Sequence, residues 1–155
     1  MARTSYMEGY EMNLNWDLRF LNLTEHIAQW SKDPSTKVGA VITDPQRRII
    51  STGYNGFPQG VDDAIINREQ KLLKTIHAEA NAILFARTDL YNTNIFVNLP
   101  PCSSCAAKII QSGVGRVVFF EPPVEFMDRW KESHEAAMEM FFQAHVKVDV
   151  YAKTV

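Results

Sequence analysis

The alternation of apolar and polar positions divides the chain into predicted helices and strands. A period of about 3.6 residues over 15–30 predicts a helix, with Asn15 as its N-cap. Two short apolar runs, 38–43 and 49–54, are separated by a turn around Asp44-Pro45 and predict a β-hairpin. A glycine-rich loop over 53–60 and a polar insert over 61–74 follow, and the insert has room for one short helix.

The first predicted helix carries two apolar stripes instead of one. One stripe consists of Leu14, Leu18, Leu21 and Ala28. The other consists of Trp16, Phe20, Leu23, Ile27 and Trp30. Two stripes predict a helix that is covered on more than one side, by its own sheet and by another subunit.

After the insert, helices and strands alternate. Helices are predicted over 77–87, 102–111 and 127–144, and strands over 94–98, 116–120 and 146–150. Gly113 is a suitable stop for the second of these helices. Alternation of this kind predicts parallel strands joined by right-handed crossovers, with helices on both faces of the sheet. We therefore expect an α/β fold of three layers, α/β/α, around a five-stranded mixed sheet with an antiparallel N-terminal hairpin.

Composition limits the classes of function. The 155 residues, 46% of them hydrophobic, suffice for a single domain over 1–155, with residues 1–13 as a loose arm. The 16 basic and 18 acidic residues leave a net charge of −2, which argues against a nucleic-acid polymer as partner. No apolar run reaches the roughly 20 residues of a membrane span, and the N-terminus lacks the apolar stretch of a signal peptide. We expect a cytoplasmic protein that has no membrane partner.

Two short motifs carry candidate chemistry. His77-Ala78-Glu79 is followed downstream by Pro101-Cys102-Ser103-Ser104-Cys105, which contains both cysteines of the chain. One histidine and two thiolates are three ligands that zinc accepts, and three protein ligands leave its fourth position open. Glu79 is of the right type to move protons at a zinc-bound water.

The spacing within each motif restricts where a metal would lie. Cys102 and Cys105 are three positions apart, so both face one way at the start of a helix. His77 and Glu79 are two positions apart, which would separate them by about 200° in mid-helix. They can share a metal only at a helix end, and we therefore expect two helices to begin at one site, at the carboxyl edge of the parallel strands.

Each motif also has a simpler explanation. Cys-x-x-Cys alone is common in structural zinc sites and redox pairs, and His-Ala-Glu is common by chance. A structural zinc would require a fourth ligand, for which the remaining histidines His26, His134 and His145 are candidates. A non-catalytic zinc-binding assembly protein would have no need of Glu79.

In combination, H-x-E and P-C-x-x-C form a signature of zinc-dependent deaminases. With the stretches 31–42, 52–60, 77–83 and 101–113, the chain resembles the cytidine and deoxycytidylate deaminase superfamily, and most closely its deoxycytidylate (dCMP) deaminases. The Gly53-Tyr54-Asn55-Gly56 loop distinguishes this group from tRNA adenosine deaminases, which are the alternative activity.

The resemblance implies a fold, a metal and a reaction. It implies the cytidine-deaminase fold, Zn²⁺ on His77, Cys102 and Cys105, and hydrolysis of dCMP to dUMP and ammonia with Glu79 as proton shuttle. It also implies a base pocket near Val38 and the Ala78 backbone, with Asn55 holding the sugar or phosphate.

The resemblance further implies nucleotide regulation and oligomer formation. Activation by dCTP with Mg²⁺, inhibition by dTTP and a homohexamer are common among these enzymes. The candidate effector residues are Tyr54, Gly56, Gly60, Asp62, Asp63, Asn67 and Phe85. Acidic Asp62 and Asp63 have the chemistry to bind Mg²⁺ or a sugar hydroxyl. The alternative for this segment is an ordinary glycine turn and a solvated insert.

The chain also departs from some relatives. It has no spare cysteine for the second, structural zinc that some viral and animal members hold in the insert. The loop over 121–125 contains no tyrosine, so an aromatic residue that closes the pocket would come from elsewhere, for example Trp130. Four residues remain open as phosphate contacts, namely Lys32, Thr36, Lys37 and Arg129, and Arg87 is the candidate for an effector arginine.

Overall fold

A computed structural model of the chain describes residues 15–64 and 67–153. The elements in chain order are α2 (Trp16–Ala28), β1 (Gly39–Thr43), β2 (Ile49–Tyr54), α3 (Arg68–Lys74), α4 (Ala78–Ala86), β3 (Asn94–Val97), α5 (Ser103–Gln111), β4 (Arg116–Phe120), α6 (Val124–Gln143) and β5 (Lys147–Tyr151). The arm expected over 1–13, and Leu14 of the first apolar stripe, lie outside the described residues.

The five strands form one mixed sheet in the order β2-β1-β3-β4-β5. β1 runs antiparallel to both of its neighbours, whereas β3, β4 and β5 are parallel to one another. β2 therefore points the same way as β3, and every strand except β1 ends at the same edge. The predicted mixed sheet with an antiparallel hairpin is confirmed.

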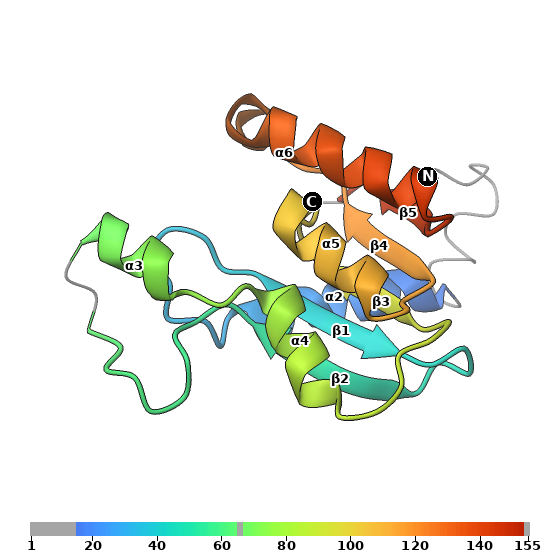
Figure 1. Cartoon of the computed structure of the whole chain (residues 1–155), viewed down its shortest axis with the longest axis horizontal. Coiled ribbons are helices and arrows are strands. Elements are labelled where there is room, and N and C mark those ends of the chain that lie inside the picture. The colour runs from blue at the N-terminus through green and yellow to red at the C-terminus, as the bar shows by residue number, and fades with distance from the viewer. Residues whose placement is uncertain (1–14, 65–66, 154–155) are drawn as a thin grey trace.

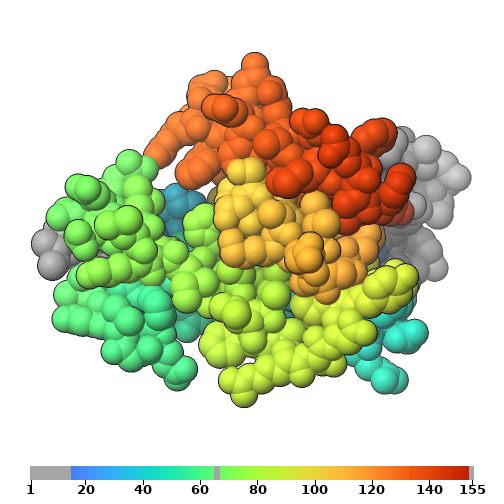
Figure 2. Space-filling view, in the orientation of Figure 1, coloured from blue at the N-terminus to red at the C-terminus, as the bar shows by residue number. Residues whose placement is uncertain are grey.

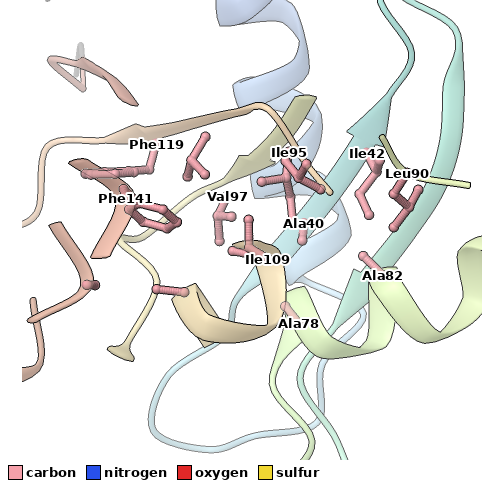
Figure 3. Packing of buried hydrophobic residues seen from close by; sticks show 14 residues of the cluster. Ala40, Ile42, Ala78, Ala82, Leu90, Ile95, Val97, Ile109, Phe119 and Phe141 are labelled. Carbon is pink, nitrogen blue, oxygen red and sulfur yellow. The ribbon is translucent and has the colours of Figure 1, made fainter. Parts of the chain in front are cut away.

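The helices cover the two faces of the sheet unequally, and this arrangement confirms the predicted three layers. Of the helices in the described ranges, only α2 lies on one face, where Phe20, Leu21 and Ile27 pack against the strands. α4, α5 and α6 lie on the other face (Figure 1). Figure 3 shows this larger core, in which Ala78 and Ala82 of α4 and Ile109 of α5 point toward the strands.

Two glycines allow helices to lie close to the sheet. A Cβ on Gly39 would be 2.2 Å from the Thr24 carbonyl oxygen of α2, and one on Gly53 would be 2.3 Å from the Ala78 carbonyl oxygen of α4. Only a residue without a side chain fits at either position. Gly53 matters for function because α4 carries part of the candidate metal site.

Some predicted helix boundaries are wrong. The first helix ends at Ala28 instead of residue 30, and the Trp30 side chain is 52% exposed. α6 begins at Val124 instead of Met127 because Pro123 is its N-cap, where proline's fixed φ suits a helix start. Phe142, near the end of α6, is 83% exposed.

The remaining boundaries differ from the predicted ones by at most one residue, and α3 is the short helix expected in the insert. Gly113 follows α5 with φ of 95°, as expected of a helix stop. Within the described ranges, no helix combines the length and the apolar character needed to cross a membrane.

Candidate metal centre and nucleotide cavity

Two helices begin at the same point in the fold. His77 is the N-cap of α4, with extended backbone angles (φ −70°, ψ 156°), and Cys102 is the N-cap of α5 (φ −71°, ψ 169°). Cys105 follows in the first turn of α5, and its amide lies 3.5 Å from the Cys102 Sγ. Two residues at positions i and i+2 in mid-helix would point about 200° apart around the helix axis. His77 is the N-cap and has non-helical backbone angles, so this separation does not hold for His77 and Glu79.

The three candidate ligands lie within bonding range of one ion. The Nδ1 of His77 is 3.5 Å from the Sγ of Cys102 and 3.3 Å from the Sγ of Cys105. In a tetrahedral zinc site, with Zn–S of about 2.3 Å and Zn–N of about 2.0 Å, nitrogen and sulfur ligands are roughly 3.5 Å apart. All three ligand atoms lie within 4.8 Å of one another, so the residues present fit Zn²⁺.

The protonation of these groups also suits a cation. A hydrogen bond from Cys105, together with one from His77, lowers the pKa of Cys102 to about 4. The same hydrogen bond to Cys102, together with burial, raises the pKa of Cys105, and hydrogen bonding to Cys102 raises the pKa of His77. Without a metal, protons on Cys105 and His77 are therefore shared in hydrogen bonds with the Cys102 thiolate. A divalent ion bound by the three side chains would displace these protons.

Glu79 lies in the first turn of α4, beside this cluster. Its side chain is only 4% exposed, and burial raises the pKa of Glu79 to about 7. A carboxyl group whose pKa is near neutral both accepts and donates protons readily at neutral pH. The position and environment of Glu79 are therefore those of a proton shuttle.

A cavity of about 230 Å³ opens beside the cluster. Its walls come from the 33–38 loop, α3, the start of α4, the 99–102 segment and the first half of α6. Figure 2 shows the surface hollowed between α3, α5 and the first part of α6. His77, Glu79 and Cys102 lie on its wall, so a ligand in the cavity would reach the metal site.

The three residues expected to bind substrate all line this cavity: Val38, Asn55 and Ala78. The Asn55 amide group is already partly used, because its Oδ1 accepts from the Val38 amide (2.9 Å) and its Nδ2 donates to the Thr36 carbonyl (2.9 Å). One N–H and one lone pair of this side chain remain for other partners. Asn55 thus shapes the cavity wall as well as lining it.

Lysine and arginine side chains on the cavity wall come from two helices, α3 and α6. Thr36 and Arg129 line it, whereas Lys32 and Lys37 are not among the lining residues. Arg68 and Lys71 of α3 line it as well, and sequence reasoning missed both. Their spacing could have been noticed in the sequence, because positions 68, 71, 72 and 75 fall on one side of a helix. In the structure all four residues line the cavity.

Aromatic and polar residues of α6 complete the cavity. Trp130 lines it, as expected, and stacks on Phe126 with ring centroids 6.2 Å apart. Ser133 and His134 line it one turn later. His134 lies edge-on to Phe119, and its Nδ1 is buried without a hydrogen-bond partner among the described residues.

The seven candidate effector residues lie outside the cavity lining, around the loop and the insert. Tyr54 packs edge-on against Trp30, and Gly56 forms an isolated β-bridge with Ile76. Asp63 pairs with Lys32, and Asn67 caps α3. The remaining three are Gly60 with φ of 85°, Asp62, which accepts from the Ala64 amide, and exposed Phe85 on α4.

The alternative fourth ligands lie apart from the cluster. Among the described residues, the group that could hold a metal contains His77, Cys102 and Cys105 but none of His26, His134 and His145. His134 lines the cavity without joining this group. Arg87 lies at the C-cap of α4, away from the cavity lining.

Comparison with known proteins supports the same assignment. The sequence model of the cytidine and deoxycytidylate deaminase zinc-binding region matches residues 14–121. An uncharacterised deaminase from the luxG 3′ region of Aliivibrio fischeri is 50% identical over 135 residues, covering 86% of this chain and 91% of that protein. Human deoxycytidylate deaminase is 35% identical over 132 residues, covering 79% and 71%.

A solved structure shares the fold. The dCMP deaminase of the cyanophage S-TIM5, in complex with dCMP and dUMP, superposes with a TM-score of 0.71 at 22% identity over 88% of this chain and 96% of that one. The cytidine-deaminase fold implied by the resemblance is confirmed. With its three zinc-type ligands and its match to the family model over most of its length, the chain belongs to the cytidine and deoxycytidylate deaminases and is a hydrolytic deaminase.

Proposed function

We propose that this protein deaminates dCMP to dUMP and ammonia. The observation that supports this most directly is the coincidence of three features in one cavity. The wall of that cavity holds the His77–Cys102 part of the metal cluster, the buried carboxyl of Glu79, and basic side chains suited to a phosphate. Human deoxycytidylate deaminase, at 35% identity, supports the choice of substrate.

The reaction divides between a metal and the residues of this chain. His77, Cys102 and Cys105 would hold Zn²⁺, which when bound supplies a Lewis acid that makes water nucleophilic near neutral pH. Glu79 accepts the proton that water loses as its oxygen attacks C4 of the cytosine ring, and delivers that proton to the ring nitrogen N3. Glu79 then transfers the second proton of the former water to the amino group, which leaves as ammonia when the C4–N bond breaks.

The cavity wall orients the nucleotide for this sequence. Ala78 is the first residue of α4, so its backbone amide has no carbonyl partner within the helix and is free to donate to the edge of the pyrimidine. Val38 supplies an apolar wall for the base, and Trp130 with Phe126 supplies an aromatic one. The spare N–H of Asn55 is suited to the sugar or phosphate.

A phosphate on the substrate fits the charges of the cavity. Glu79 and Asp33 line it together with Arg68, Lys71 and Arg129. Lys71 is paired with Asp33, which leaves the two guanidinium groups without an acidic partner among the described residues. A phosphate dianion would satisfy them.

A nucleotide panel tests the proposal. Ammonia release should be measured with dCMP, deoxycytidine, cytidine, dCTP and adenosine at equal concentration. We expect the highest kcat/KM with dCMP. Equal or better turnover of the unphosphorylated nucleosides would contradict the proposal. A tRNA anticodon stem-loop is assayed as an additional substrate, and deamination of its loop adenosine would indicate the alternative activity.

Regulation and assembly are further parts of the proposal. We infer that dCTP with Mg²⁺ activates and dTTP inhibits through the loop and insert that contain Gly56, Asp62 and Asp63, and that the active form is a cytoplasmic homohexamer. The proximity of this segment to the cavity supports it, because the Gly56–Ile76 bridge joins the loop to the residue directly before His77. Kinetics and mass in solution, with and without each effector, test these points.

A further inference from the structure

The short helix α3 is held in place by a charged residue. Lys71 is its only buried residue, at 6% exposure, whereas Leu72 and Leu73 are 58% and 74% exposed. Most surface helices are anchored by apolar side chains that face the core. Since α3 has no buried apolar side chain, its docking depends on what Lys71 contacts.

Lys71 contacts the 33–35 loop, which also lines the cavity. Its Nζ lies 3.1 Å from the Oδ1 of Asp33 and 3.2 Å from the Oγ of Ser35. The side chains of the ion pair are only 8% and 10% exposed. Removing one partner of so buried a pair would leave an uncompensated buried charge, so separating α3 from the loop is costly.

Asp33 is itself the organising residue of that loop. Its Oδ1 accepts from the amides of Ser35 (2.8 Å) and Thr36 (3.1 Å). Burial raises the pKa of Asp33, but these amides and the Lys71 ammonium outweigh it and hold the pKa below its usual value, so the carboxylate is ionised at neutral pH. The Thr36 carbonyl in turn accepts from Asn55. Hydrogen bonds therefore run from α3 through the loop to a residue of the substrate cavity.

The ion pair fixes which side of α3 faces the cavity. Arg68, Lys71, Leu72 and Thr75 follow the i, i+3, i+4, i+7 spacing of one helix side, and all four line the cavity. Arg68 lies almost one turn before Lys71 and has no acidic partner among the described residues. An arginine in this position is suited to bidentate contact with a phosphate.

We propose that Lys71 is a positioning residue: its ion pair with Asp33 holds α3 against the cavity so that Arg68 contacts the phosphate of the bound nucleotide. This inference rests on the proposed dCMP substrate. It assigns the selection of a phosphorylated over an unphosphorylated substrate to the insert, whereas the metal cluster and Glu79 perform the chemistry.

Steady-state kinetics of Lys71→Met, Lys71→Arg, Arg68→Gln and the Lys71→Met/Arg68→Gln double variant test the inference. Lys74→Met is the matched control, because Lys74 is exposed on the same helix and is not a cavity residue. Each protein is assayed with dCMP and with deoxycytidine, and its affinity for dUMP is measured by calorimetry. Zinc content and thermal unfolding show that each variant is folded.

We expect KM for dCMP to rise by about tenfold or more in Lys71→Met and Arg68→Gln, with kcat changed by less than about threefold, since a hydrogen bond to a charged group is lost. The affinity for dUMP should fall by a similar factor. Lys71→Arg should recover most of the loss, and the double variant should be no worse than Arg68→Gln. In each variant kcat/KM should fall far more for dCMP than for deoxycytidine, because only dCMP carries the phosphate.

Two results would overturn the inference. One is a Lys71→Met protein with the dCMP KM of Lys74→Met. The other is an equal loss of kcat/KM for dCMP and deoxycytidine, which would indicate a purely structural role. Failure of the proposed function looks different: the wild-type protein itself would then show no preference for dCMP over deoxycytidine, and the phosphate role of Arg68 would fall with it.

Discussion

Gly53 of β2 lies directly beneath Ala78 of α4, so close that a Cβ on the glycine would be 2.3 Å from the Ala78 carbonyl oxygen and 2.5 Å from the Ala82 amide nitrogen. Since His77 is the N-cap of α4 and Glu79 lies in its first turn, this contact sets the height of the candidate metal ligand and of the proposed proton shuttle above the sheet. The position of these groups thus depends on a residue that is neither a candidate metal ligand nor a cavity residue.

Gly53→Ala should therefore weaken both stability and metal binding. The added methyl meets helix backbone, which cannot rotate away, and overpacking of this kind costs about 1–3 kcal/mol of unfolding free energy. Gly56→Ala is the control for stability, because a Cβ there meets nothing within 4 Å. Thermal unfolding and zinc content measure both effects. A Gly53→Ala protein with the wild-type melting temperature and full zinc would show that α4 can shift at little cost.

Glu79→Gln should remove catalysis and leave the zinc in place. The amide has nearly the same shape as the carboxylate and cannot shuttle a proton, so we expect kcat for dCMP to fall by roughly 10³-fold. Because Glu79 is not one of the three clustered ligands, metal analysis should give the wild-type zinc content. Residual activity within tenfold of wild type would exclude Glu79 as the proton shuttle.

Zinc should bind the metal-free protein more tightly as the pH rises. Cys102, with a pKa of about 4, is already a thiolate at neutral pH, whereas Cys105 and His77 have raised pKa values and must lose protons to bind. Each displaced proton makes the affinity rise about tenfold per pH unit. Chelator competition between about pH 6 and 8 measures this slope, and an affinity independent of pH would show that the cluster is deprotonated before zinc arrives.

The proposed regulation predicts a selective effect of acidic residues in the insert. If Mg²⁺ with dCTP binds near Asp62 and Asp63, then the Asp62→Asn/Asp63→Asn double variant should lose activation by dCTP while its activity without effectors persists. Asp89→Asn, at an exposed position outside the insert, is the control. Kinetics that neither dCTP nor dTTP alters in the wild-type protein would remove the regulatory proposal altogether.

The sequence was sufficient for the elements and the metal cluster because both depend on local spacing. The Cys102–Cys105 spacing and the i, i+2 spacing of His77 and Glu79 could be placed on helix starts without any tertiary information, and α4 and α5 do begin there. The order of the strands in the sheet could not be predicted from the sequence. Nothing local shows that β1 lies between β2 and β3, because that depends on pairing across the whole sheet.

The cavity wall was only partly predictable for the same reason. Val38, Ala78 and Trp130 were expected there, but Arg68 and Lys71 lie in a segment that looks like an ordinary solvated insert. A buried lysine is rare, and its burial here depends on Asp33, which is 38 residues away along the chain. Long-range ion pairs of this kind leave no periodic trace in a sequence.

The division of α6 along its length has a consequence for how substrate choice can change. Its first half, with Phe126, Arg129 and Trp130, borders the cavity beside the candidate metal site, and its second half holds Ala137 and Phe141 in the core. If the cavity binds the nucleotide as proposed, substitutions in the first half can change which nucleotide is accepted, while the second half keeps the helix packed against the core. Substrate preference can then change without loss of the fold or of the three candidate metal ligands.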